Sequence, residues 1–168
     1  MFAEGDWIVY ASTGVCRVSS VGSLAENPAA DRNKIYYTLL PFHGRETIYI
    51  PVDSSVFMRP VISCREAEDL LKKVLELDAP ACITRDLKLL REYYRKFLRT
   101  HTCEDLVRLI RSVREKNRKL EARGGHPRKI DQDYQKRAEE LLYTELSTAL
   151  HQPYDLVVQR VEQQIGNT

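Results

Sequence analysis

Two rows of basic side chains carry the clearest chemistry in this chain, and that chemistry is the binding of phosphate. Within each row the residues recur at intervals of three and four, so at 100° per residue they share one helix face. Guanidinium groups donate paired hydrogen bonds to phosphate oxygens, which suits a surface that meets a nucleic-acid backbone. The first row is Lys88, Arg91, Arg95 and Arg99, and the second is Arg108, Arg111, Arg114 and Arg118.

The net charge of +2 averages over segments of opposite sign. Residues 85–137 carry 17 Lys and Arg against 8 Asp and Glu, an excess of +9, whereas residues 138–168 carry 1 against 5. Residues 1–60 carry 5 against 6. A solvated helix surface would also place charge outside, and that reading stays open. The local excess, with few acidic neighbours on the same helices, favours contact with phosphate.

Catalytic chemistry is not indicated by the remaining polar residues. The histidines stand singly, and no nucleophile accompanies them in a recognisable motif. The four cysteines are far apart with no CxxC pair, so neither a zinc site nor a disulfide framework is expected. We therefore expect no enzyme activity, no cofactor, no metal and no small-molecule substrate. The residues concerned are His43, His101, His126, His151, Cys16, Cys64, Cys82 and Cys103.

No apolar run approaches the length of a membrane span, and the first residues do not have the pattern of a signal peptide. The sequence therefore predicts a cytoplasmic protein without membrane contact.

The first 60 residues predict short strands, because β-branched and aromatic residues cluster in runs that turn residues separate. The expected strands are Asp6–Tyr10, Val15–Val21, Ile35–Phe42 and Thr47–Val52. Four or five short strands in so few residues favour a small β-barrel.

Helical spacing begins after Pro60. A capping box of Ser63 and Glu66 starts the first helix, and Thr84 and Thr102 are expected to cap the second and third. A fourth helix is expected from about Ile130 to Leu150, and a fifth after Pro153. The fold class is therefore α+β with two domains, a barrel over residues 1–60 and an all-helical domain of about five helices over residues 61–168.

The segment from Arg45 to Ile50 alternates polar and apolar residues before Pro51, which is typical of a strand at a sheet edge. Such an edge can pair with a strand of another protein. The expected docking residues are Arg45, Glu46, Thr47, Ile48, Tyr49 and Ile50.

An ordered series of motifs in the first domain resembles the CarD/CdnL-like bacterial transcription regulators and the related polymerase-interacting module of transcription-repair coupling factors. The series is Gly5-Asp6-Trp7-Ile8-Val9-Tyr10, Gly14-Val15, Tyr36-Tyr37-Thr38-Leu39, Ile48-Tyr49-Ile50-Pro51-Val52 and Met58-Arg59-Pro60-Val61-Ile62-Ser63. The resemblance implies a Tudor-like barrel that binds the β subunit of RNA polymerase. It also implies a helical domain that contacts upstream promoter DNA and stabilises the open complex.

Two departures from the family pattern bear on these expectations. Ala11 and Thr13 replace the proline and histidine common after the first strand, which changes a turn rather than the fold. Members of the family also wedge a tryptophan into the minor groove, whereas Leu87 aligns at that position here. Leucine can act as an apolar wedge, but it cannot donate a hydrogen bond as indole can. DNA contact is therefore expected largely through phosphates.

These expectations combine into a non-catalytic transcription regulator that binds polymerase through one domain and promoter DNA through the other. The alternative is a protein–protein adaptor with no direct DNA contact, in which the basic rows are only solvated.

Overall fold

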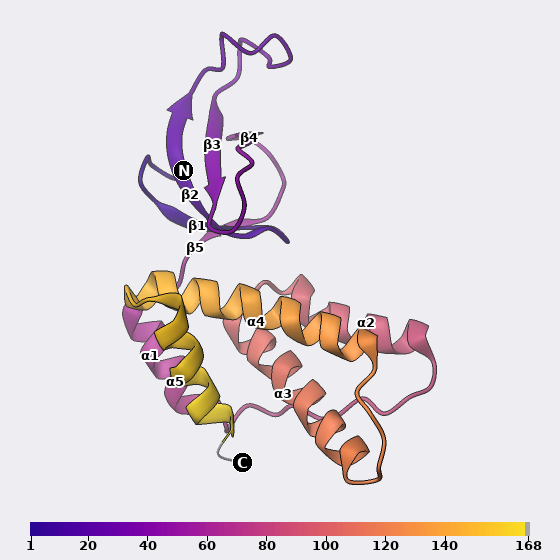
Figure 1. Ribbon diagram of the computed structural model, residues 1–168. Coiled ribbons are helices and arrows are strands. Elements are labelled where there is room, and N and C mark those ends of the chain that lie inside the picture. The colour runs from indigo at the N-terminus through magenta and orange to yellow at the C-terminus, as the bar shows by residue number, and fades with distance from the viewer. Residues whose placement is uncertain (167–168) are drawn as a thin grey trace. The chain divides into compact units, whose positions relative to one another are not determined.

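The computed structural model describes residues 1–166 and divides into two compact units. The first spans Met1–Val61, and the second begins at Ile62. Figure 1 shows the first as a sheet and the second as helices only. The expected α+β class is confirmed by five strands followed by five helices.

The strands form one antiparallel sheet in the order β4-β3-β2-β1-β5. They are β1 (Trp7–Tyr10), β2 (Gly14–Gly22), β3 (Tyr36–Pro41), β4 (Ile48–Pro51) and β5 (Met58–Pro60). The four expected strands are confirmed to within one residue at each end. Since β4 and β5 are the outer strands, the recorded pairing is that of an open sheet, and closure into the expected barrel is not shown.

One face of the sheet carries the main cluster of buried side chains, because alternate residues of each strand point the same way, while Val9 and Val15 on the other face are also buried. Its buried members are Ile8, Cys16, Val18, Tyr37, Leu39 and Ile50. Burial raises the pKa of the Cys16 thiol to about 11, so this cysteine is a protonated packing residue.

The helices of the second unit begin and end close to their expected positions. They are α1 (Cys64–Lys73), α2 (Leu87–Arg99), α3 (Cys103–Glu121), α4 (Lys129–Leu150) and α5 (Tyr154–Gly166). The capping box of Ser63 and Glu66 is confirmed, and so is the cap at Thr102. The expected cap at Thr84 is wrong, because the Asp86 carboxylate accepts from the backbone N–H groups of Lys88 and Leu89 at the start of α2. The Thr84 hydroxyl accepts from Asp86 N instead.

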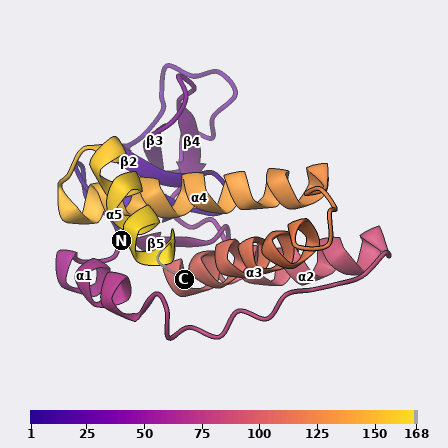
Figure 2. The ribbon, with the colours of Figure 1, turned by 60° about the horizontal axis from the view of Figure 1, so that its bottom comes forward.

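The helical core gathers around α3 and α4, which contact each other, while α2 packs on α3 and both α1 and α5 pack on α4. Figure 2 shows α3 and α4 side by side, with α2 along α3. Buried side chains of this core include Leu90, Tyr94, Phe97, Leu109, Ile110, Val113, Ala138, Leu142, Leu146, Val157, Val161 and Ile165. None of the helices in residues 1–166 combines the length and apolarity that crossing a bilayer requires.

An irregular segment over residues 74–86 joins α1 to α2, and side chains of the helices hold its carbonyl groups. Arg111 donates to the carbonyls of Val74 and Leu77. Tyr93 and Ser112 both donate to the carbonyl of Pro80, at 2.5 and 2.6 Å. These bonds satisfy backbone groups that lack a helical partner, and they position the start of α2.

Candidate functional site

β4 leaves one side of its backbone unpaired, because it pairs with β3 and is the last strand of the sheet. Val52 N donates to Ile35 O at 3.0 Å. Since strand residues alternate, the N–H groups of Ile50 and Ile48 also face β3, and that of Tyr49 faces the open side. Pro51, which has no N–H, lies where none is needed for β3. The edge position expected from the alternating pattern is therefore confirmed.

The six residues expected to dock on a partner divide into two groups. Arg45, Glu46 and Thr47 are exposed, and Tyr49 is 49% exposed. Ile50 is buried and Ile48 packs against the core, and the backbones of both pair with β3, so neither is placed to contact a docking strand directly. Docking through this edge stays a prediction.

The basic row of α2 faces solvent. Lys88 and Arg91 are exposed, and neither forms an ion pair with any residue in the described part of the chain. Both Arg95 and Arg99 form ion pairs with Glu92, and in each pair a guanidinium nitrogen lies 3.2 Å from a carboxylate oxygen. The hydrogen bond from Arg95 is the main cause that lowers the pKa of Glu92.

Exposed apolar side chains adjoin the α2 row at the start of the helix. Leu87 is 47% exposed, and Ile83 and Leu89 are also exposed. Arg85 and Lys88 lie among them in the sequence, so the beginning of α2 presents apolar side chains within a basic surrounding.

The basic row of α3 is largely engaged within the molecule. Arg108 bonds to Asp105 at 2.6 Å and Arg118 to Glu115 at 2.9 Å. Bonds from Arg118 and Lys119 lower the pKa of Glu115 to about 2. Arg111 holds the carbonyls of the segment before α2. More of the positive charge of the α3 row is therefore bound within the molecule than the sequence indicates.

Arg114 joins three helices through two carboxylates that the sequence pattern does not place near it. It donates to Glu139 of α4 at 2.9 Å and to Glu162 of α5 at 2.5 and 3.1 Å. Burial acts to lower the pKa of Arg114, but these bonds raise it overall. Tyr143 donates to the same Glu162 at 2.8 Å.

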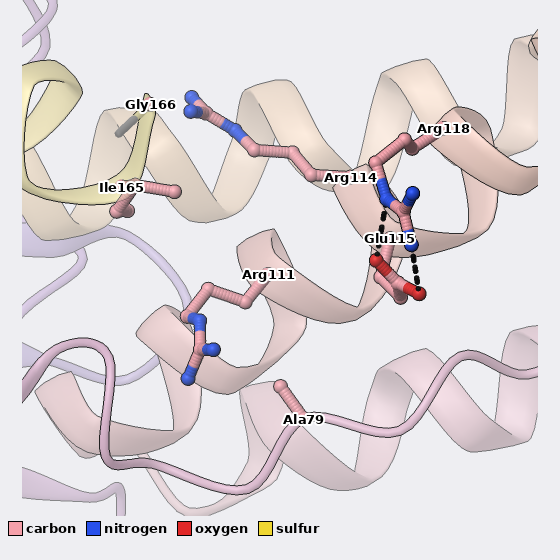
Figure 3. Close-up of a pocket in the computed structure, with 7 residues that line it drawn as sticks. All are labelled: Ala79, Arg111, Arg114, Glu115, Arg118, Ile165 and Gly166. Carbon is pink, nitrogen blue, oxygen red and sulfur yellow. Dashed lines mark hydrogen bonds and ion pairs between the residues drawn. The ribbon is translucent and has the colours of Figure 1, made fainter. Parts of the chain in front are cut away.

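A cavity of about 550 Å³ lies beside these arginines. Its lining residues are Ala79, Arg111, Arg114, Glu115, Arg118, Ile165 and Gly166. Figure 3 shows that the guanidinium groups of Arg111, Arg114 and Arg118 point in different directions, and that Arg118 is bound to Glu115. The three cations therefore do not converge on one position where a single phosphate could bind.

The contacts of Arg114 with Glu139 and Glu162 should contribute stability that is lost in acid. The bond from Arg114 lowers the pKa of Glu162, so its stabilisation is complete above the ordinary carboxyl value of about 4.3. It is lost as the pH falls from there through the lowered value. Arg114→Ala should reduce the free energy of unfolding by roughly 1–3 kcal/mol near neutral pH. It should also flatten the loss of stability below about pH 5, which urea titrations across pH would measure. An unchanged pH dependence in this variant would contradict the assignment.

Comparison with known proteins gives a match for the sheet unit. Residues 2–62 match the family model of the CarD-like/TRCF RID domain. The matched residues coincide closely with the first unit, which ends at Val61. This unit is similar to a domain that CarD-like proteins share with coupling factors. No curated protein matches the chain. The resemblance carried by the strand motifs is thus supported for the first unit.

Proposed function

We propose that this chain is a non-catalytic transcription regulator that binds the β subunit of RNA polymerase and contacts upstream promoter DNA to stabilise the open complex. The observation that carries the proposal is the family match over residues 2–62, in a unit whose β4 edge is unpaired. Its place of action is then the cytoplasm, where bacterial polymerase works.

Polymerase binding takes the form of strand addition. A strand of the β subunit extends the sheet at β4, where the Tyr49 N–H faces outward and the exposed Arg45, Glu46 and Thr47 lie just before it. Main-chain hydrogen bonds give affinity in this mode, and alternate side chains give specificity.

DNA binding is proposed for the start and exposed face of α2. Lys88 and Arg91 form no ion pair with any residue from 1 to 166, and the exposed Leu87 side chain can act as an apolar wedge at a base step. Four further arginines contribute to DNA binding by exchanging their carboxylate partner for a phosphate: Arg95, Arg99, Arg108 and Arg118. Arg111 and Arg114 have internal roles, so we expect less from them.

The two contacts act together because one chain carries both. Polymerase already bound at a promoter raises the effective concentration of DNA near α2, so weak phosphate contacts are enough to keep the helical unit on DNA. Sequence preference then comes from polymerase, and the helical unit adds salt-dependent affinity.

Lys88→Ala with Arg91→Ala should weaken retention on a polymerase–promoter complex, because two phosphate contacts are lost. The slope of log affinity against log salt should decrease by about 2, since each contact releases about one counterion. The matched control is Arg65→Ala with Lys72→Ala, which removes the same charge from exposed positions on α1.

Equal behaviour of the two double variants would contradict DNA contact by α2. If both also kept full binding to polymerase, the adaptor function without DNA contact would replace the proposal for the helical unit.

A further inference from the structure

The face of the sheet opposite its main buried cluster carries a row of large exposed side chains beside the buried Val9 and Val15. Trp7 pairs with Arg17, and Arg17 pairs with Leu40, so the three side chains point to the same face of adjacent strands. Trp7 is 38% and Leu40 is 43% exposed. Phe42, also 38% exposed, lies with its ring centroid 6.2 Å from that of Trp7. We call Trp7, Arg17, Leu40 and Phe42 the outer row.

Arg17 lies in the middle of the outer row. It is exposed, and it forms no hydrogen bond or ion pair with any side chain in residues 1–166. Water solvates the exposed Arg17 guanidinium, but a partner that covers the neighbouring apolar side chains would remove that water and must therefore neutralise the charge. The outer row therefore fits an apolar protein surface that carries one Asp or Glu.

The outer row is continuous with the open edge of β4. Thr38 pairs with Tyr49, which places the exposed Tyr49 ring on the same face as Leu40, two residues further along β3. A strand added to β4 would lie next to Tyr49, and the protein that supplies it would extend over this face. Aromatic residues and arginine are also the types enriched at the centre of protein interfaces.

We propose that the outer row is a second part of the polymerase-binding surface, where Trp7, Leu40 and Phe42 pack on apolar side chains and Arg17 pairs with a carboxylate of polymerase. This inference rests on the proposed function. Two other occupants fit less well. Residues 1–60 carry 5 basic against 6 acidic residues, which does not attract a nucleic acid, and a second copy would bring two Arg17 side chains together.

The test uses the full chain and purified core RNA polymerase of the same organism, with binding measured by fluorescence anisotropy. Arg17→Glu should raise the dissociation constant at least about tenfold, because it places like charges opposite each other. Arg17→Lys keeps the charge and should lose less. Leu40→Ser tests the apolar part. Arg65→Glu is the matched control, since its side chain is 92% exposed on α1 in the other unit.

The outcomes separate the two proposals. If the wild type binds while Arg17→Glu and Leu40→Ser stay within twofold of it, the outer row is not part of the interface although the proposed function stands. If the wild type does not bind at all, both proposals are wrong. A loss with Arg17→Glu that Arg65→Glu does not show supports the inference, and circular dichroism confirms that the variants remain folded.

Discussion

Tyr49→Pro should lower the affinity of the chain for RNA polymerase by more than tenfold. The Tyr49 N–H faces the open side of β4, as the bond from Val52 to Ile35 indicates, and proline removes this donor. The proline ring also obstructs a strand that approaches from that side. The loss of this hydrogen bond, worth about 1 kcal/mol, together with the obstruction by the ring, gives the expected effect. Binding to core polymerase by anisotropy measures it.

Tyr49→Ala is the control, because it removes the side chain and keeps the N–H. A backbone contact predicts that alanine binds better than proline. The fold should survive both changes, since Ile48 and Ile50 keep their bonds to β3, and thermal unfolding checks this. Equal affinities for the wild type and the proline variant would exclude strand addition at β4.

Lys116→Met should lower the free energy of unfolding by about 3–5 kcal/mol, because it leaves a buried carboxylate without its counter-charge. Asp131 is fully buried at the start of α4, and its Oδ1 accepts from Lys116 of α3 at 2.8 Å and from Tyr94 of α2 at 2.6 Å. Burial, followed by the bond to Asp131, raises the pKa of Tyr94, so its hydroxyl remains a donor. This cluster joins three helices at one oxygen, and urea unfolding measures its contribution.

The double variant Lys116→Met with Asp131→Leu tests whether the charges act as a pair. Removing both charges leaves only the Tyr94 hydroxyl without its acceptor, so the double variant should be more stable than Lys116→Met alone. A cost below about 1 kcal/mol for Lys116→Met would contradict the dependence of the buried Asp131 carboxylate on this counter-charge.

The sequence predicts elements well where local signals dominate. Runs of β-branched and aromatic residues between turn residues predict four strands, and the Ser63–Glu66 capping box predicts the start of α1. β5 is not predicted from the sequence, because it has only three residues, ends in proline and pairs with β1, which is distant in the sequence. The cap of α2 was placed at Thr84 rather than Asp86, because both residue types cap helices and they lie two positions apart. Which of the two residues caps α2 depends on the backbone conformation of the segment before the helix, and local sequence does not determine that conformation.

The candidate site is less predictable, because the partners of a charged side chain come from anywhere in the fold. Spacing identifies Glu92 and Glu115 as neighbours of the basic rows, but not Glu139 and Glu162, which reach Arg114 from α4 and α5. Lys116 contributes to the basic excess of the sequence although it is buried on Asp131. Net charge by segment therefore overstates the surface available to DNA, and α2 is its clearest part.

We propose that the sheet unit brings this chain to RNA polymerase. Binding of the full chain to purified core polymerase, followed by cross-linking from position 49 to identify the subunit, tests this. We predict saturable binding and cross-links to the β subunit. Absence of binding, or cross-links confined to other subunits, would contradict the account.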